Sequence, residues 1–323
     1  MSQNKAALTN KPKKHHYVSQ FYLRGFLDSN SQLNIFDRYN KVFLKRTPGG
    51  IAYNENYYTV DTKQEKGSTI LEETLGLVET KAKPVIDKLT QHGAVLTKEE
   101  RENLGLFLAL QQQRVPDSEK AKREMAEKTY KAVAQKFAHL LATNNEAFET
   151  TKKKVPKVKG SPELTQEDWL GLATGEKFKL EIEVPHSFVV KQMFDLALEV
   201  APLICQMNWK VLYASKSRAF TTSDNPFILS GSPWAPGRGV GLITPRSRKF
   251  FPLTKGACLF MGDQPTATLE FASATSDGVR QINRLTALNS DRYIISHNQD
   301  LLKRIVKITK VDTFIKEERV QVG

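Results

Sequence analysis

The sequence HHYVSQFYLRGF, residues 15–26, is the stretch around which the rest of the chain is organised. At 3.6 residues per turn it predicts a short helix, whose apolar face would carry Val18, Phe21, Tyr22, Gly25 and Phe26. A polar row on the other side would carry His16, Gln20 and Arg24, each four residues from the last. Such a helix presents an imidazole, an amide and a guanidinium in line, which suits the binding of an anion.

The composition is that of a folded globular protein. Of the 323 residues, 40% are hydrophobic and 26% are charged, which is enough for one large domain or two modest ones. No apolar run approaches the roughly 20 residues of a membrane span, and the basic N-terminus lacks the apolar core of a signal peptide. Cys205 and Cys258 both have apolar neighbours, which is typical of buried free thiols. We therefore expect a cytoplasmic protein without a membrane segment.

The net charge points to polyanionic partners. It is +13 at pH 7, and an excess of this size favours nucleic acid. A contribution to solubility explains the same charge equally well. Residues 1–14 hold four lysines and predict a flexible basic arm. The lysines between 152 and 159 alternate with proline and glycine, which predicts an exposed basic insert at about 143–180.

Hydrophobic periodicity predicts an α+β fold. A mainly helical N-terminal half, with a short β-hairpin over 33–37 and 41–45, would pack on a largely antiparallel C-terminal sheet. Helices are expected at about 68–93 (kinked or divided at Pro84), 97–114, 119–142, 185–205, 278–288 and 301–308. Strands are expected at 209–213, 219–222, 239–243, 249–251, 257–261 and 292–296. Residues 15–323 would then form one domain that carries the insert.

A polar loop, Ser-Asp-Asn-Pro at 223–226, directly follows one predicted strand. Asp224 and Asn225 could offer oxygen ligands to Mg²⁺ or Mn²⁺, with Glu55 as a further ligand. They could also act as a base and its orienting group. The alternative is an Asx turn that merely ends the strand.

Two further groups are candidates for contact with a phosphate. Arg114 lies where a helix must end before Pro116, and arginine suits bidentate contact with phosphate, although a cation there also complements the helix dipole. Adjacent residues of a helix point to different faces, so we do not expect His15 and His16 to bind one metal together. His16 is a candidate general base or acid and His15 a phosphate donor, or either is a histidine at the edge of the core. The possible carboxylate partners of His16 are Glu55, Glu72 and Glu79.

Five segments, HHYVSQFYLRGF, NIFDR, ENYYTV, QQQRVP and FTTSDNPF, together resemble the bacterial family catalogued as domain of unknown function 4238. The resemblance covers nearly the whole chain, although the family's usual opening has proline where this chain has Ser19. It implies one full-length unit and no particular activity. Its motif residues are His15, His16, Gln20, Arg24, Asp37, Arg38, Glu55, Arg114, Asp224 and Asn225.

Two functions fit these patterns. The first is a nucleic-acid-directed hydrolase of phosphodiesterase or nuclease type, in which the motifs converge on one site. In that site His16 would transfer protons, Gln20 would orient it, Arg24 and Arg114 would neutralise phosphate, and Asp224 with Asn225 would hold a divalent ion or position water. The second is a nucleic-acid-binding protein without catalysis, whose motif residues are saturated by hydrogen bonds that hold the fold together.

Overall fold

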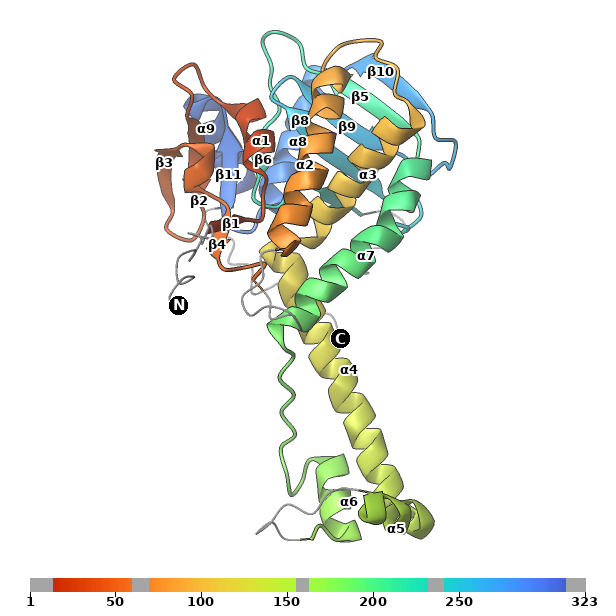
Figure 1. Cartoon of the computed structure of the whole chain (residues 1–323). Helices are drawn as coiled ribbons and strands as arrows, with labels where there is room; N and C mark the ends of the chain where they lie inside the picture. Colours follow the sequence, from red (N-terminus) through yellow and green to blue (C-terminus); the bar gives the residue numbers. More distant parts are fainter. Residues whose placement is uncertain (1–13, 60–69, 155–162, 232–240, 312–323) are drawn as a thin grey trace, which may run out of the picture. The chain divides into compact units, whose positions relative to one another are not determined.

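The chain divides into two compact units. A computed structural model of the chain describes residues 14–59, 70–154, 163–231 and 241–311 (Figure 1). Unit 1 comprises residues 1–118 and 190–323, and unit 2 comprises residues 119–189. Unit 2 therefore includes the predicted insert and extends beyond it on both sides.

A five-stranded sheet forms the centre of unit 1. Its strand order is β10-β5-β9-β8-β7, and every neighbouring pair is antiparallel except β10 with β5. The strands are β5 (Trp209–Tyr213), β7 (Ile228–Ser230), β8 (Arg248–Thr254), β9 (Ala257–Met261) and β10 (Leu269–Ser273). The predicted α+β class and the largely antiparallel C-terminal sheet are thus confirmed.

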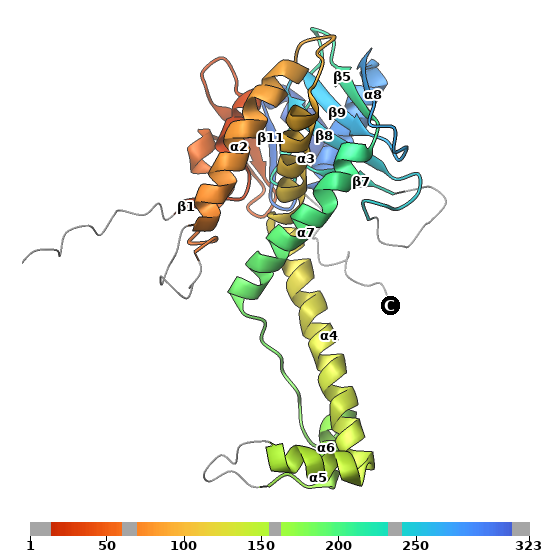
Figure 2. The same cartoon turned by 45° about the vertical axis from the view of Figure 1, so that its right-hand side comes forward.

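Helices cover both faces of this sheet. In both views α2 (Ile70–Leu89), α3 (Lys98–Gln113) and α7 (His186–Gln206) lie on the same side (Figure 1, Figure 2). Residues of these helices share one buried cluster with Phe251 and Leu259 of the sheet. On the other face, α8 (Ser276–Asn289) packs against the neighbouring side chains Phe250 and Cys258. Successive strand residues point to opposite faces, so both faces of β8 and β9 are apolar.

A second sheet joins the two ends of the chain. Its order is β3-β2-β11-β6 and all its pairs are antiparallel. The strands are β2 (Leu33–Asp37), β3 (Val42–Arg46), β6 (Thr222–Ser223) and β11 (Tyr293–Ser296). The helix α9 (Gln299–Thr309) packs its apolar face on this sheet through Leu302 and Val306. The predicted hairpin β2–β3 is therefore completed by strands from the C-terminal half.

The predicted helix over residues 15–26 is wrong in its first half. Lys14–His16 form strand β1, which pairs with β4 (Tyr53–Glu55) so that His16 lies opposite Tyr53. The chain is helical only from Gln20, in α1 (Gln20–Leu23) followed by a 3₁₀ turn over Arg24–Phe26. The backbone of β1 finds its hydrogen-bond partners in β4, about forty residues later, and local periodicity carries no signal of such a pairing.

Several other predicted elements differ in detail. The helix α2 runs through Pro84 undivided. By contrast, α3 begins as predicted, at the capping box of Thr97 and Glu100. The predicted insert contains two helices, α5 (Asn145–Lys154) and α6 (Gln166–Thr174), which follow α4 (Pro116–Thr143). The short strands β7 and β10 were not expected, residues 241–243 form no strand, and residues 1–13 and 232–240 lie outside the described residues. Within the described ranges, no helix has the length and hydrophobicity needed to cross a membrane.

Two glycines in unit 1 allow a test of this packing. A Cβ atom at Gly105 of α3 would lie 2.2 Å from Sγ of Cys205 in α7, whereas a Cβ at Gly76 of α2 meets nothing within 4 Å. We expect Gly105→Ala to lower the free energy of unfolding by about 1–3 kcal/mol through overpacking. Gly76→Ala should instead raise it by about 0.5–1 kcal/mol, because alanine favours the helix. Urea denaturation checks both, and equal effects of the two substitutions would contradict the close approach of α3 and α7.

Candidate functional site

A buried arginine lies at the centre of the candidate site. Arg114 caps the C-terminus of α3 and is 1% exposed. Its Nη1 donates to Oε1 of Glu79 on α2 at 2.8 Å, and its Nη2 donates to the hydroxyl of Ser19 and, at 2.7 Å, to Oε1 of Gln111. The Ser19 hydroxyl donates in turn to Glu79 at 2.7 Å, and the amide of Gln111 donates to the Tyr17 carbonyl at 2.9 Å. The guanidinium is therefore engaged within the protein.

Glu79 keeps this buried guanidinium charged. Burial opposes the positive charge, but the adjacent carboxylate of Glu79 outweighs it and raises the pKa of Arg114 above its ordinary value. Glu79 itself is more accessible, with 25% of its side chain exposed. The two side chains thus form a fixed ion pair, in which the carboxylate lies nearer to solvent than the guanidinium does.

His16 lies beside this pair. Its Nδ1 accepts a hydrogen bond from the side-chain amide nitrogen of Gln20 at 3.3 Å, although His16 lies in β1 and not in the predicted helix. Its Nε2 is buried and makes no hydrogen bond with a described side chain. Burial lowers the pKa of His16 below 6.5, although a hydrogen bond with the backbone of Gly49 and the charge of Glu79 both act to raise it. The imidazole is therefore mostly neutral at pH 7, and it carries its hydrogen on Nε2 because Nδ1 accepts from Gln20.

Lys14 and Tyr53 form the outer edge of the same site. The ammonium of Lys14 lies 4.6 Å from the centre of the Tyr53 ring, and that ring lies 5.6 Å from the ring of His16. Lys14 is exposed, whereas Tyr53 and His16 are half-buried. The β1–β4 pairing produces this arrangement, because it sets His16 opposite Tyr53. A cation and an aromatic face thus flank the imidazole.

Glu72 supplies a second titratable group without a partner. It lies seven residues before Glu79 on α2, which places both on one face of the helix. Oε2 of Glu72 is buried and accepts no hydrogen bond from the described part of the chain. Burial raises the pKa of Glu72 to about 7, the charge of Glu79 adds to this, and Arg114 opposes it. Two neighbouring carboxyl groups in such different environments are typical of acid–base sites.

The predicted SDNP loop has a structural role in this fold. Asp224 is 1% exposed and accepts backbone N–H bonds from Asp291 at 2.9 Å, Arg292 at 2.6 Å and Tyr293 at 3.0 Å. The carboxylate thereby closes the connection between α8 and β11. Burial, with the charge of Asp291, raises the pKa of Asp224 to about 7 against these three amides. The carboxylate forms no Asx turn, because Pro226 has no N–H to donate; the local turn is made by the Ser223 hydroxyl, which accepts the Asn225 N–H at 3.2 Å.

The other predicted site residues are dispersed. His15 is fully buried, stacks on Tyr58 at 5.7 Å and accepts the Tyr58 N–H at 2.8 Å, so it does not face a phosphate. Arg24 and Glu55 are both exposed, on the 3₁₀ turn and on β4. The side-chain amide of Asn289 donates to the carbonyl of Asn225 at 2.8 Å.

Two motif residues next to the Asp224 loop also hold the fold together. Asp37 pairs with Arg292 at 2.8 Å, and Arg38 donates to the carbonyl of Ser290. Across the described residues, no group of three or more His, Cys, Asp or Glu side chains could hold a metal ion. The structure therefore brings His16, Gln20 and Arg114 together but places Asp224 and Asn225 in a separate network.

Three contributors to the site were not predicted from the sequence. Nothing in the pattern marks Ser19, Lys14 or Tyr53 as neighbours of His16, because each reaches the site through the extended segment before α1 or through β4. A signal existed for Glu72 and Glu79, since two glutamates seven residues apart share a helix face. The sequence could not show that this face meets Arg114.

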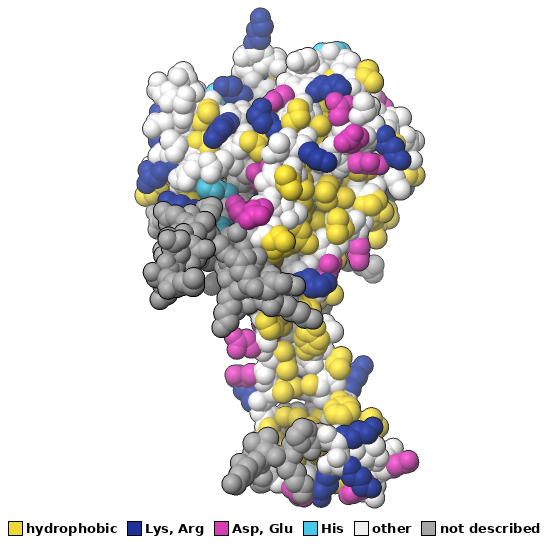
Figure 3. Space-filling view, in the orientation of Figure 1, with side chains coloured by type: hydrophobic (Ala, Val, Ile, Leu, Met, Phe, Trp, Pro, Cys, Tyr) yellow, Lys and Arg dark blue, Asp and Glu magenta, His cyan; other side chains and the backbone are white. Residues whose placement is uncertain are grey.

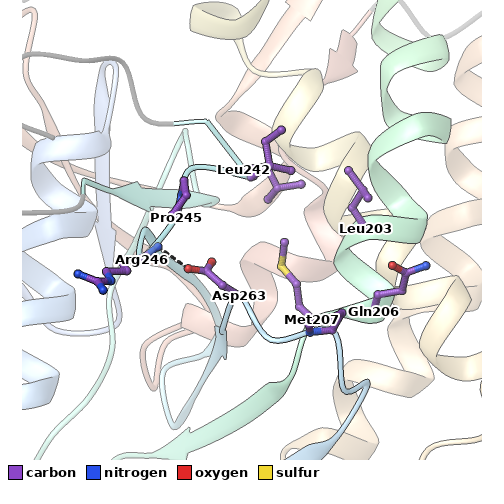
Figure 4. Close-up of a pocket in the computed structure, with 9 residues that line it drawn as sticks. Leu203, Gln206, Met207, Leu242, Pro245, Arg246 and Asp263 are labelled. Carbon is purple, nitrogen blue, oxygen red and sulfur yellow. Dashed lines mark hydrogen bonds between the residues drawn. The ribbon is translucent and has the colours of Figure 1, made fainter. Parts of the chain in front are cut away.

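A separate cavity of about 430 Å³ lies in unit 1 between the end of α7 and the loops before β8 and after β9 (Figure 4). Its lining is mainly apolar and includes Leu203, Met207 and Leu242. The carboxylate of Asp263 accepts the backbone N–H of Arg246 at 2.5 Å and pairs with the buried ammonium of Lys249. The acidic group of this cavity is thus already neutralised by Lys249. The cluster around His16 is therefore the stronger candidate for chemistry.

The fold and the cluster define an α+β protein with a half-buried histidine–carboxylate site. The chain belongs to the family described as "Protein of unknown function (DUF4238)", whose match spans residues 14–300. This confirms the resemblance seen in the sequence motifs. No curated protein and no solved structure matches the chain.

The buried ion pair can be tested by a substitution that keeps its shape. We expect Glu79→Gln to lower the free energy of unfolding by about 2–3 kcal/mol, because Arg114 then remains buried without a counter-charge. Glu102→Gln provides the control, since Glu102 pairs with Lys98 on an exposed face and should cost less than about 0.5 kcal/mol. Chemical denaturation measures both variants. Similar costs would show that the Arg114–Glu79 pair is no more than a surface ion pair.

The raised pKa of Glu72 predicts a dependence of stability on pH. Between pH 4.5 and about 7 the folded state keeps a proton on Glu72 that the unfolded state has released. The stabilisation is complete below pH 4.5 and is lost as the pH rises through about 7. Relative to Glu72→Gln, the wild type should therefore become steadily less stable across this interval, as urea denaturation at several pH values would show. Asp224 is present in both proteins and cancels; parallel curves would contradict the pKa of Glu72.

Proposed function

We propose that this protein is a nucleic-acid-directed phosphodiester hydrolase in which His16 transfers the proton. The observation that carries the proposal is the Nε2 atom of His16, which is buried, carries the hydrogen of a neutral imidazole and makes no hydrogen bond to a described side chain. Buried polar atoms are rarely left without a partner, and a reactive site is one of the common reasons. The proposal keeps the hydrolase hypothesis drawn from the sequence and changes the residues assigned to it.

Each surrounding residue then has a separate task. Gln20 holds Nδ1 and so directs Nε2 toward a substrate. Lys14, exposed beside the Tyr53 ring, takes the role of contacting phosphate that was expected of Arg24 and His15. Arg114 is a positioning residue, because its hydrogen bonds hold Glu79 and Ser19 rather than a ligand.

The positive charge supports a polyanionic substrate for unit 1 in particular. Residues 119–189 contain 13 Lys and Arg against 11 Asp and Glu, so most of the +13 surplus lies in the remainder of the chain. Within unit 2, lysines such as Lys152 and Lys177 pair with acidic neighbours. On the face shown in Figure 3, lysine and arginine side chains are dispersed rather than gathered in one patch. On this face, the dispersed charges suit a general attraction of nucleic acid rather than a single basic groove.

A second function is favoured by the Asp224 network. Asp37, Arg38, Asp224 and Arg292 are motif or neighbouring residues, and all of them support the fold through hydrogen bonds. If all of the motif residues are structural, none of them is left for catalysis. The positive charge would then serve to bind nucleic acid without cleaving it. Binding would then weaken steeply with salt and would not change on substitution of His16.

Cleavage assays with a matched histidine control test the proposal. We expect the wild type to cleave labelled RNA or DNA, and His16→Gln to slow cleavage at least about 100-fold, the usual contribution of a proton-transfer group. His139→Gln should leave the rate unchanged, because His139 is exposed on α4 in unit 2. Reactions are run with Mg²⁺, with Mn²⁺ and with chelator, and circular dichroism confirms that each variant folds.

The same assays separate the two functions. Equal rates for His16→Gln and the wild type would remove His16 from the mechanism. Salt-dependent binding without cleavage of either nucleic acid would favour the binding protein. If neither cleavage nor binding occurs, both functions fail and the charge reverts to a role in solubility.

A further inference from the structure

We infer that two copies of this chain associate through the helix α4 of unit 2, and that the two helices lie side by side in opposite directions. The contact surface is an exposed apolar stripe along α4, formed by Tyr130, Val133, Phe137 and Leu140. None of these residues belongs to the site around His16, so the inference is independent of the proposed hydrolase activity.

The members of the α4 stripe are all open to solvent and share one face of the helix. The exposed fraction is lowest for Tyr130, at 44%, and highest for Val133, at 59%. The four residues follow one another at intervals of three, four and three, which is the spacing of a coiled-coil seam. On the face shown in Figure 3, hydrophobic side chains gather on unit 2 where Figure 1 draws α4. Single exposed apolar side chains are common, but a continuous row of them marks an interaction surface.

The same face of α4 is covered within unit 2 only at its beginning. Ala126, four residues before Tyr130 and in line with the stripe, is buried against Val184 and Val189. The ring of Tyr130 makes an edge contact with Phe188, with 5.9 Å between the ring centres. The last three members of the stripe belong to none of the buried clusters that the described residues form. The apolar face therefore continues beyond the point at which its cover within unit 2 ends.

Unit 2 exposes more large apolar side chains than it buries. Its described residues bury only three of them, namely Leu141, Val184 and Val189. They expose eight, which are the four of the stripe together with Met125, Leu164, Leu170 and Phe178. A unit of this size with so small a core gains little stability from its own burial, and association is one way in which small units make up the difference. A second copy is present wherever the chain is made, so it can supply the missing burial at all times.

The stripe is complementary to itself when the second helix runs in the opposite direction. Around a twofold axis Tyr130 of one copy meets Leu140 of the other, and Val133 meets Phe137. Every layer then combines one aromatic ring with one aliphatic side chain, so the layers have similar volumes. In a parallel pair each residue would meet its own copy, and layers of two rings would alternate with layers of two smaller side chains. The sequence of the stripe therefore favours the antiparallel pair.

The positions beside the stripe are compatible with close contact between two helices. At 3.6 residues per turn, the flanking positions within its length hold Thr129, Ala134, Lys136 and Leu141. Lys136 is the single charged residue among them, and its long side chain can extend to solvent along the edge of the contact. A depletion of charge is typical of the buried centre of an interface.

The mass of the full chain in solution tests the association. At micromolar concentration we expect sedimentation equilibrium to give about twice the 36.5 kDa of one chain. Val133→Glu and Phe137→Glu should each reduce this mass to that of one chain, because the contact would bury a carboxylate. Met125→Glu is the control: Met125 is 72% exposed on the same helix but lies about 100° away from the stripe, so this variant should stay dimeric. Circular dichroism confirms that each variant folds. A wild type with the mass of one chain, or glutamate variants in the stripe that keep the doubled mass, would overturn the inference.

Cysteine variants at the two ends of the stripe test the direction of the pair. Antiparallel helices bring residue 130 of one copy against residue 140 of the other, but they separate the two copies of residue 130 by about 15 Å along the helices. Chains with Tyr130→Cys, mixed with chains with Leu140→Cys, should therefore form a disulfide-linked dimer on mild oxidation, and either variant alone should not. The wild type, which retains Cys205 and Cys258, is the control. If either variant alone is cross-linked as efficiently as the mixture, the helices do not pair in opposite directions.

Discussion

The contact between the buried Arg114 and Glu79 is the constraint on which the candidate site depends. It joins α2 to the end of α3, and through Ser19 it also fixes the extended segment that leads into α1. Desolvating a guanidinium is costly, and the fold offsets this cost with a carboxylate, a hydroxyl and an amide. Because the guanidinium is held by all of these partners, the ion pair acts on His16 and Glu72 as a fixed electrostatic environment.

The elements that could be predicted from the sequence are those whose information is local. The helices α3, α7 and α8 repeat apolar residues at helical spacing, and Thr97 with Glu100 marks the start of α3 within a few residues. The pairing of β1 with β4, and the edge strands β7 and β10, depend on partners far along the chain. Residues 15–26 favour a helix by pattern, yet the first of them are extended because their hydrogen bonds are made elsewhere.

The candidate site was predictable in part for the same reason. His16 and Gln20 meet as their spacing indicated, although they meet across a bend rather than along a helix. Asp224 had the composition of a ligand or of an Asx turn, but its three backbone donors from residues 291–293 show that its carboxylate instead joins two distant segments of the chain. Sequence motifs identify which residues are polar and grouped, but the partners that use up their hydrogen-bonding capacity come from the tertiary structure.

Ser19 shows how a small departure in sequence can lie at the centre of a site. Its backbone, at φ −56° and ψ 133°, suits the proline that is usual in the family's opening. The substitution therefore changes little in the course of the chain. A proline there could not donate to Glu79 or accept from Arg114. In such a chain Arg114 alone would have to hold Glu79, without the hydroxyl. The direct 2.8 Å contact between Arg114 and Glu79 is then the essential part of the support, and the serine makes it more rigid.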